Sequence, residues 1–245
     1  MTRPLLEIDR VSVRFGGLVA VDEADFTLEP GRVTGLIGPN GAGKTTLFNV
    51  ITGLQAPSGG AIRFGGVDIS RWSADKRARN GIARTFQRLE VFGSLSVFDN
   101  VLTAAELRRT WAHEPRPARE VAREALERAG ILSYADAMSD AVPTGIARLT
   151  ELARALALRP RLLLLDEPSS GLSQPETEAF AELLRDVAAA GTAVLLVEHD
   201  VDLVMGLCDP VHVLDFGQVI CSGPPAVVQA DERVQAAYLG IAAAS

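Results

Sequence analysis

Three short stretches of the chain are apolar at nearly every position, without polar alternation. They are Val33–Ile37, which includes one Thr and one Gly, Leu162–Leu165 and Ala193–Val197. A strand that is buried on both faces gives a continuous apolar run, whereas a half-buried strand alternates. The pattern therefore predicts a parallel core sheet covered by helices.

The N-terminal part of the chain has a different pattern. Its apolar residues alternate loosely and are separated by glycine turns, in the segments Leu5–Arg14, Val19–Leu28 and Ala61–Phe64. This is typical of a small antiparallel sheet. Near the other end, Val211–Leu214 and Val219–Cys221 flank a four-residue turn and predict a hairpin. The turn contains Asp-Phe-Gly, but the other motifs of a protein kinase are missing from the sequence.

Helical spacing dominates between residues 95 and 141. One set of apolar residues that we expect on one helix face is Val97, Val101, Leu102 and Leu107. A second set follows Pro115 and Pro117, and comprises Val121, Ala122, Ala125, Leu126 and Ala129. We interpret this region as a helical insertion. The predicted division is a core of residues 1–86 plus 142–245 and a helical subdomain of residues 87–141.

Each continuous apolar run ends in polar residues. Glycines follow the first run, Asp166 and Glu167 end the second, and Glu198 and His199 follow the third. Ligands of open α/β sheets bind beyond the carboxyl ends of the strands. We therefore expect these three ends to converge on one site.

A complete phosphate-binding loop follows the first run. It consists of Gly38, Pro39, Asn40, Gly41, Ala42, Gly43, Lys44, Thr45 and Thr46. Its glycines let successive backbone N–H groups surround phosphate oxygens, the lysine supplies a positive charge, and the Thr45 hydroxyl is a ligand for Mg²⁺. Thr45 to Thr52 has the pattern of a helix, so the phosphate would lie at a helix N-terminus. A chance glycine-rich turn is the alternative, and the flanking strand and helix disfavour it.

The second run places two carboxylates at a strand end. Asp166 is suited to hold Mg²⁺, and Glu167, one residue further on, is suited to polarise an attacking water. Two surface carboxylates that merely end a strand are the alternative. The phosphate loop in the same chain favours the first interpretation.

Composition narrows the class of protein. The formal net charge is −7 and the pI is about 5.1, which argues against bulk electrostatic binding of nucleic acid or anionic lipid. Cys208 and Cys221 are too few for a disulfide framework or a zinc site. The apolar runs are far shorter than the roughly 20 residues of a membrane helix. With no secretory leader expected at Met1–Pro4, we predict a cytoplasmic protein that docks on a membrane partner.

These motifs together resemble the ATP-binding subunit of an ABC transporter over essentially the whole chain. The resemblance implies a P-loop NTPase of the α/β class, with ATP and Mg²⁺ as cofactors. It also implies that Gln87 contacts Mg²⁺ and the attacking water, that His199 contacts the γ-phosphate and that Phe15 stacks on adenine. His113 and His212 match no motif, and we expect structural or exposed roles for them.

The chain departs from this family at two places. The family's Leu-Ser-Gly-Gly-Gln signature, which closes the site of a second subunit, corresponds to Val142-Pro143-Thr144-Gly145-Ile146. Ser173 stands where the family usually has an aspartate. Proline has neither an N–H nor a hydroxyl to offer a phosphate, although Thr144 has a hydroxyl. We hypothesise a heterodimer with unequal sites; a lineage variant with near-normal function is the alternative.

Two segments are similar to the ATP-binding subunits of branched-chain amino acid importers. One is Arg84–Gln87 with Phe92, Leu95, Val97 and Asn100 after it, and the other is Arg233–Gly240. The resemblance implies a second ATPase subunit, permease subunits and, indirectly, a solute-binding protein as partners. Importers of urea or short amides have similar sequences here. A non-transport ABC ATPase and a cassette with a mainly structural role remain alternatives. The basic stretch between Arg71 and Arg84 is interpreted as a solvated face.

Overall fold

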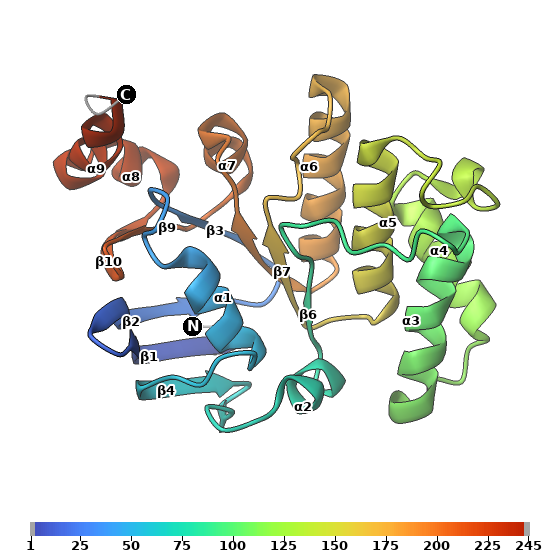
Figure 1. Ribbon diagram of the computed structural model, residues 1–245, viewed down its shortest axis with the longest axis horizontal. Coiled ribbons are helices and arrows are strands. Elements are labelled where there is room, and N and C mark those ends of the chain that lie inside the picture. The colour runs from blue at the N-terminus through green and yellow to red at the C-terminus, as the bar shows by residue number, and fades with distance from the viewer. Residues whose placement is uncertain (1–2, 243–245) are drawn as a thin grey trace.

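Two β-sheets enclose a helix at the centre of the computed structural model, which describes residues 3–242 (Figure 1). The larger sheet has the strand order β10-β9-β3-β8-β7-β6, and its inner strands pair in parallel. Its strands are β3 (Val33–Ile37), β6 (Ile82–Arg84), β7 (Leu162–Asp166), β8 (Ala193–Val197), β9 (Val211–Asp215) and β10 (Gln218–Gly223). The three strands predicted from continuous apolar runs are therefore confirmed, and so is the hairpin of β9 and β10.

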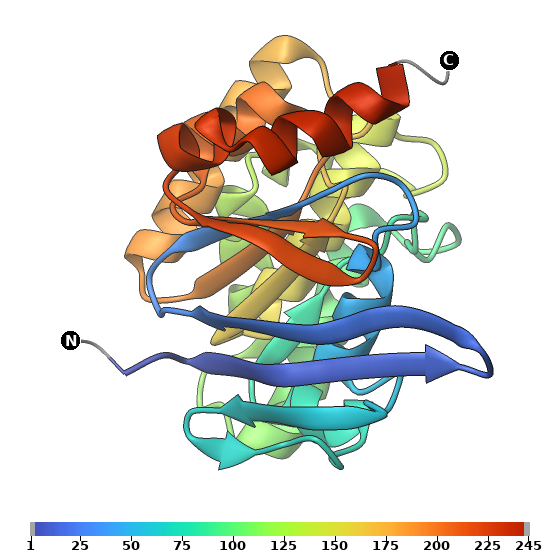
Figure 2. The same ribbon diagram turned by 90° about the vertical axis from the view of Figure 1, so that its left-hand side faces the viewer.

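The smaller sheet is antiparallel, as the alternating pattern predicts, with the order β2-β1-β4-β5. Its strands are β1 (Leu6–Phe15), β2 (Leu18–Leu28), β4 (Gly59–Phe64) and β5 (Val67–Asp68). Figure 2 shows the blue β1 and β2 and the cyan β4 facing the viewer below the red C-terminal helices.

The parallel sheet is buried on both faces. Leu162 and Leu164 point into a core shared with the antiparallel sheet and α1 (Lys44–Thr52). Leu163 and Leu165, which alternate with them, point into a second core with α5 (Thr144–Ala157), α6 (Gln174–Ala189) and α7 (Val201–Leu207). Each buried leucine stabilises the fold by about 1.5–3 kcal/mol relative to exposure. This two-sided burial explains why β7 is apolar at every position before Asp166.

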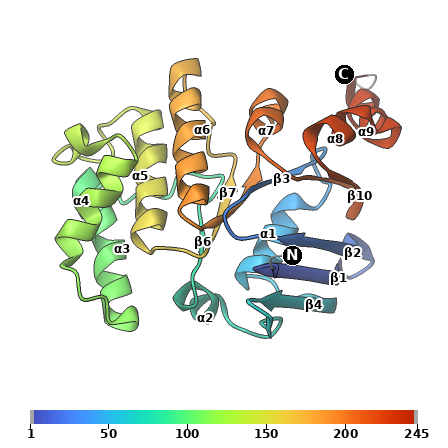
Figure 3. The same cartoon turned by 180° about the vertical axis from the view of Figure 1, so that it is seen from behind.

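A third core joins α3 (Val97–Ala112), α4 (Ala118–Arg128) and one face of α5, and these helices stand together at one end of the molecule (Figure 3). The predicted apolar face of α4 is buried throughout. The prediction for Leu107 is wrong, because its side chain is 52% exposed. At about 100° per residue, Leu107 lies some 240° around the helix from the buried Val101.

Helix α5 packs against two cores at once, with Leu152 in the second and Ile146 and Ala153 in the third. The division between residues 1–86 plus 142–245 and residues 87–141 therefore stays a prediction. The remaining helices are α2 (Ala74–Arg79), the 3-10 turn η1 (Leu132–Tyr134), α8 (Pro225–Ala230) and α9 (Glu232–Ala242). Among residues 3–242, no helix has the length and apolar character needed to span a bilayer.

Candidate functional site

The carboxyl ends of β3, β7 and β8 meet at one cleft, as predicted from their polar ends. The cleft has a volume of about 390 Å³. Its walls come from β1, β2, the phosphate loop and the strand ends, and are formed by Phe15, Leu18, Val19, Ala20, Asn40, Gly41, Ala42, Gly43, Lys44, Thr45, Thr46, Gln87, Asp166, Glu167 and Val197. The cleft therefore contains the glycine-rich loop, both strand-end carboxylates and an exposed aromatic ring.

The phosphate loop needs glycine at two positions, Gly38 and Gly43. Gly38 and Gly43 have φ values of 153° and 108°. A Cβ on Gly38 would overlap the carbonyl oxygen of Leu214, and one on Gly43 would overlap that of Ala20. Gly43 precedes the first residue of α1 and has no side chain with which to cap the helix. The first amides and the positive end of the α1 dipole are thus available to an anion in the cleft.

Lys44 is folded back onto this loop. Its Nζ donates hydrogen bonds to the carbonyl oxygens of Gly38, at 2.6 Å, and Pro39, at 2.9 Å. Burial lowers the pKa of Lys44, and the nearby carboxylates of Glu167 and Asp166 oppose that shift. The ammonium group therefore lies over the loop in the position of a phosphate counter-charge.

Glu167 leaves the direction of its strand through an unusual backbone conformation. Its φ is 50°, in the left-handed region, and its N–H donates to the carbonyl oxygen of Val197 at 2.9 Å. The carboxylate contacts two predicted site residues: Gln87 Nε2 donates to Oε2 at 3.0 Å, and His199 Nε2 lies 2.6 Å from Oε1. The structure thus brings Glu167, which its place at a strand end suggested as the base, together with Gln87 and His199, for which the resemblance implied a role.

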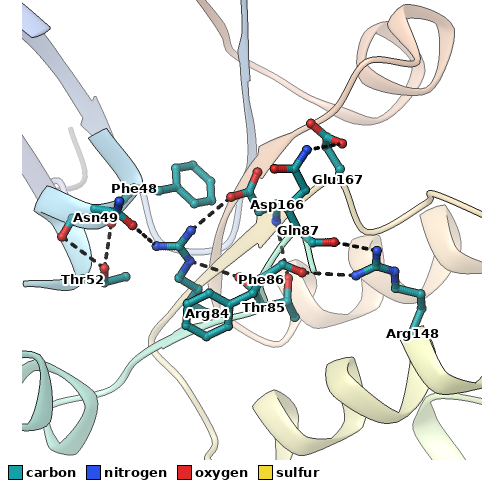
Figure 4. Close-up of polar contacts among 10 residues, drawn as sticks. All are labelled: Phe48, Asn49, Thr52, Arg84, Thr85, Phe86, Gln87, Arg148, Asp166 and Glu167. Atoms are coloured by element: carbon teal, nitrogen blue, oxygen red, sulfur yellow. Dashed lines mark hydrogen bonds and ion pairs between the residues drawn. The ribbon is translucent and has the colours of Figure 1, made fainter. Parts of the chain in front are cut away.

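Asp166 is buried beside a cation that the sequence did not identify as a site residue. Its Oδ2 accepts a hydrogen bond from the Arg84 guanidinium at 3.1 Å (Figure 4). Burial raises the pKa of Asp166, and Arg84 opposes that shift. In the sequence Arg84 belonged to the segment that precedes Gln87 and to the basic stretch interpreted as a solvated face. That interpretation is wrong for Arg84, whose side chain is 7% exposed, and for the buried Arg77. No local pattern around Arg84 predicts this ion pair, because its partner Asp166 is 82 positions away in the chain.

The oxygen atoms around Asp166 suit a magnesium ion. The Thr45 hydroxyl, the Asp166 carboxylate and the Gln87 amide all line the cleft, and hard oxygen donors are the ligands that Mg²⁺ prefers. The described residues contain no cluster of three or more His, Cys, Asp or Glu side chains that could hold a metal. A cation here would complete its shell with phosphate oxygens and water, which is the usual arrangement for Mg²⁺.

Arg148 of α5 is a second residue near the site whose contacts the sequence did not reveal. Its Nη1 donates to the carbonyl oxygen of Phe86 at 3.1 Å and its Nη2 to that of Gln87 at 2.7 Å. Figure 4 shows the guanidinium reaching across from α5 to this backbone. The segment that presents Gln87 to Glu167 is therefore attached to α5.

The segment that the resemblance matches to the signature lies at the start of α5. Pro143 is the N-cap residue and Thr144 is exposed, whereas Gly145 and Ile146 are buried. Ile146 packs into the helical core with 9% of its surface exposed. A Cβ on Gly145 would lie 3.1 Å from Leu172 and 3.2 Å from the carboxylate of Glu176. The signature segment thus packs against the start of α6.

Ser173 has a local role at that helix start. It caps α6, and its N–H and hydroxyl both donate to Glu176 Oε2 at 2.7 Å. The Ser-x-x-Glu spacing is that of a capping box, a local signal in the sequence from which this helix start could have been predicted. The two departures from the family pattern are therefore neighbours in the fold.

Phe15, His113 and His212 lie in three different environments: the cleft, the surface and the core. Phe15 is 49% exposed and lines the cleft. His113 ends α3 at an exposed position. His212 is buried on β9, where its Nδ1 lies 2.8 Å from Ser222 Oγ and its ring lies 4.6 Å from that of Phe26. These placements agree with an exposed role for His113 and a structural role for His212.

Comparison with known proteins gives the same picture over the whole chain. A family model described as ABC transporter matches residues 21–170, and one described as branched-chain amino acid ATP-binding cassette transporter matches residues 218–244. The chain is 38% identical to the high-affinity branched-chain amino acid transport ATP-binding protein BraF of Pseudomonas aeruginosa, and 36% identical to LivG of Escherichia coli K12. Each alignment covers 98% of this chain and 99% of the relative.

Among solved structures, a nucleotide-free ATP-binding cassette from an ABC transporter superposes with a TM-score of 0.86 at 28% identity. The match covers 96% of this chain and 99% of that one. The fold, the family models and the near full-length relatives agree. The chain belongs to the ABC transporter family, as one of its ATP-binding cassettes.

Proposed function

We propose that this protein is the ATP-hydrolysing subunit of an importer for branched-chain or related amino acids. Two cassettes would enclose MgATP head to tail, and their closure would drive a separate permease. The observation that carries the chemistry is the carboxylate of Glu167, held between Gln87 and His199 beside the phosphate loop. The cargo class is supported by the BraF and LivG relatives and by the match at residues 218–244.

The residues that line the cleft support the following proposed roles. Lys44 and the loop amides bind the phosphates, and Phe15 stacks on the base. Thr45, Asp166 and Gln87 hold Mg²⁺, which when bound neutralises charge on the phosphates. Glu167 accepts a proton from the attacking water. Hydrolysis requires little covalent chemistry from the protein, so catalysis depends on positioning and charge.

His199 and Gln87 act on Glu167 as well as on the nucleotide in this proposal. Each contacts a different oxygen of its carboxylate: His199 Nε2 lies 2.6 Å from Oε1, and Gln87 Nε2 lies 3.0 Å from Oε2. The contacts with Gln87 and His199 thus hold both carboxylate oxygens of Glu167 beside the phosphate loop. When ATP is bound, His199 Nε2 exchanges this contact for one to the γ-phosphate, whereas Gln87 donates to Glu167 through Nε2 and keeps its amide oxygen for Mg²⁺.

A groove of about 320 Å³ beside the helical subdomain is the proposed docking site for a short cytoplasmic helix of the permease. Three apolar side chains line it and are 40–52% exposed, namely Phe86, Phe92 and Leu107. An amphipathic helix that places its apolar face in such a groove buries these side chains. Such a partner helix would also explain why the apolar Leu107 is exposed, since it would cover this side chain.

We further propose that the partner cassette is a different chain. Pro143, Ile146 and Ser173 replace the groups that the family usually offers to the nucleotide of its partner. Ile146 is turned into the helical core, so its side chain is not directed toward a second subunit. The site built on Lys44 and Glu167, closed by the signature of the partner, would be the more competent of the two.

The proposed location is the cytoplasmic face of the plasma membrane, reached through the permease. A solute-binding protein is an indirect partner, and nucleic acid is not a partner. The acidic net charge and the lack of a membrane-spanning helix among the described residues are consistent with this assignment. Permease and binding-protein genes adjacent to the gene of this chain would support the importer.

Uptake in cells tests the proposal directly. Deletion of the gene should abolish high-affinity uptake of radiolabelled leucine, isoleucine and valine, and the wild-type gene should restore it. Lys44→Ala is the matched control, because it removes the phosphate charge and should fail to restore uptake. Uptake of radiolabelled urea and of a radiolabelled short amide by the same strains separates those cargo classes. Normal uptake of all these solutes in the deletion strain would contradict the proposal.

A further inference from the structure

An ion pair crosses the wall between the nucleotide cleft and the neighbouring groove. Asp166 lines the cleft, and Arg84 lines the groove on the other side. Their side chains are 3% and 7% exposed, and Arg84 Nη2 lies 3.1 Å from Asp166 Oδ2. The two cavities therefore share one pair of buried, oppositely charged groups.

The Arg84 guanidinium is fixed from several directions. Its Nη1 donates to Asn49 Oδ1 of α1 at 2.6 Å and its Nε to the carbonyl oxygen of Thr85 at 3.1 Å. It lies 4.6 Å from the ring of Phe86 and 5.6 Å from that of Phe48. Figure 4 shows the fork pointing toward Asn49 on one side and Asp166 on the other. A planar, rigid donor fork suits this double contact, whereas the single ammonium of lysine does not.

One short segment thus holds both carboxylates of the site. Arg84 binds Asp166, and Gln87, three residues later, binds Glu167. Thr85 between them accepts a hydrogen bond from the Asp166 N–H through its hydroxyl at 3.4 Å. The segment is also part of the groove wall, through Arg84, Thr85 and Phe86.

From this arrangement we infer that Arg84 is a positioning residue for Asp166. By binding Oδ2 it fixes the rotation of the carboxylate, and so the direction in which the other oxygen faces the Mg²⁺ site. It also ties that carboxylate to α1, the helix that follows the phosphate loop. If the groove receives the permease, as proposed above, Arg84 links that contact to Asp166 independently of Gln87.

A purely electrostatic role predicts the opposite result on substitution. A positive charge 3.1 Å from Asp166 repels a second cation, so removal of the charge alone strengthens Mg²⁺ binding. Removal of an orienting partner weakens it. Loss of a group that orients a metal ligand typically reduces metal affinity about 10–100-fold.

The test uses the isolated full-length chain and a fluorescent ATP analogue. Analogue binding is titrated with Mg²⁺ for the wild type, Arg84→Met, Arg84→Lys and Asn49→Ala, and is repeated in EDTA without Mg²⁺. Arg63→Met is the control, because Arg63 forms a partly exposed ion pair with Asp9, at 3.0 Å, and neither residue lines the cleft. Thermal melting followed by circular dichroism monitors folding.

For Arg84→Met and Arg84→Lys we expect the half-saturating Mg²⁺ concentration to rise about 10–100-fold, with binding in EDTA unchanged. Asn49→Ala should give a smaller rise, because Arg84 keeps its bond to Asp166 but loses its second anchor. Arg63→Met should behave as the wild type. Because the lysine variant retains the charge, a rise there identifies orientation as the cause.

An unchanged or lowered Mg²⁺ requirement in the Arg84 variants overturns the inference. If Arg84→Met does not fold, the half-saturating Mg²⁺ concentrations of Arg84→Lys and Asn49→Ala test the inference by the same criterion. The measurement involves neither a permease nor an amino acid. An incorrect cargo assignment would therefore leave this result intact, and a negative result here would leave the uptake experiment intact.

Discussion

At the scale of single residues, Glu167 shows how the site departs from the regular structure that supports it. A left-handed backbone costs a residue other than glycine about 1–2 kcal/mol. The conformation turns the Glu167 carboxylate out of β7 and toward Gln87 and His199, while Asp166 keeps the strand direction. Two adjacent carboxylates therefore point to different parts of the cleft.

Glu167→Gln should slow ATP hydrolysis by about 10²–10⁴-fold, because the amide cannot accept the proton of the attacking water. Nucleotide binding should persist, since the phosphate contacts of Lys44 and the loop remain. Phosphate release and analogue binding measure the two effects. Near-normal hydrolysis by this variant would show that another group is the base.

His212 should make the fold sensitive to acid. Burial lowers the pKa of its imidazole from its ordinary 6.5 to about 4, so the folded state binds this proton less readily than the unfolded state. The resulting stability is fully present above pH 6.5 and is lost as pH falls toward 4. The loss amounts to about 1.4 kcal/mol per pH unit in that interval.

Urea unfolding at several pH values tests this contribution of His212 against a His212→Gln variant. The free energy of unfolding of the wild type should fall more steeply between pH 6.5 and 4 than that of the variant. Parallel slopes for the two proteins would exclude a buried neutral imidazole at this position.

At the scale of elements, α1 is held at both ends by different means. Its N-terminus follows the phosphate loop, and its C-terminus meets the buried guanidinium of Arg77. This group donates to the carbonyl oxygens of Val50, at 2.6 Å, and Ile51, at 2.8 Å. A cation at this position complements the negative end of the helix dipole. Burial lowers the pKa of Arg77 to about 10, so the group stays charged at neutral pH.

Arg77 also donates to three carbonyl oxygens of the connection between β5 and α2, those of Ile69, Ser70 and Trp72. Arg77→Met should therefore lower the free energy of unfolding by about 3 kcal/mol, because several buried acceptors lose their donor. Arg79→Met is the control: Arg79 lies on the same helix in an exposed ion pair with Asp75. Its effect should stay within about 0.5 kcal/mol. Similar losses in both variants would contradict the proposed role of Arg77.

At the scale of the whole molecule, the parallel sheet separates two cores and α5 joins the second core to the third. The nucleotide cleft lies at the strand ends, and the altered signature begins α5. Arg148 attaches α5 to the backbone of Gln87. The segment that we propose to face a partner and the segment that contacts Glu167 are thus connected within one chain.

The proposed unequal dimer predicts unequal effects of matching substitutions in the assembled transporter. Glu167→Gln should remove most of the ATPase activity, whereas the matching substitution in the partner cassette should leave most of it. The isolated chain should bind ATP and hydrolyse it slowly, because the signature that closes its site comes from the partner. Phosphate release by the two singly substituted complexes measures this difference. Equal losses, or full turnover by the isolated chain, would contradict the asymmetry.

The elements and the main motifs follow from local sequence. Continuous apolar runs fixed β3, β7 and β8, since burial on both faces excludes polar residues from every position of the run. The glycine spacing identified the phosphate loop, because each backbone conformation in the loop restricts the residue that can occupy it. The convergence of the strand ends followed from the parallel sheet itself.

The tertiary structure alone decided which distant groups meet. The ion pair of Arg84 with Asp166 joins residues 82 positions apart, and Arg148 reaches the backbone of Gln87 from 61 positions away. Such contacts depend on how strands and helices pack, and no local pattern encodes them. Leu107 was misplaced for a different, local reason: at about 100° per residue it lies away from the face of Val101, so the helical spacing itself excludes it from that face. The sequence by itself determined an ATP-binding cassette, and the packing of its layers determined how its two carboxylates are held.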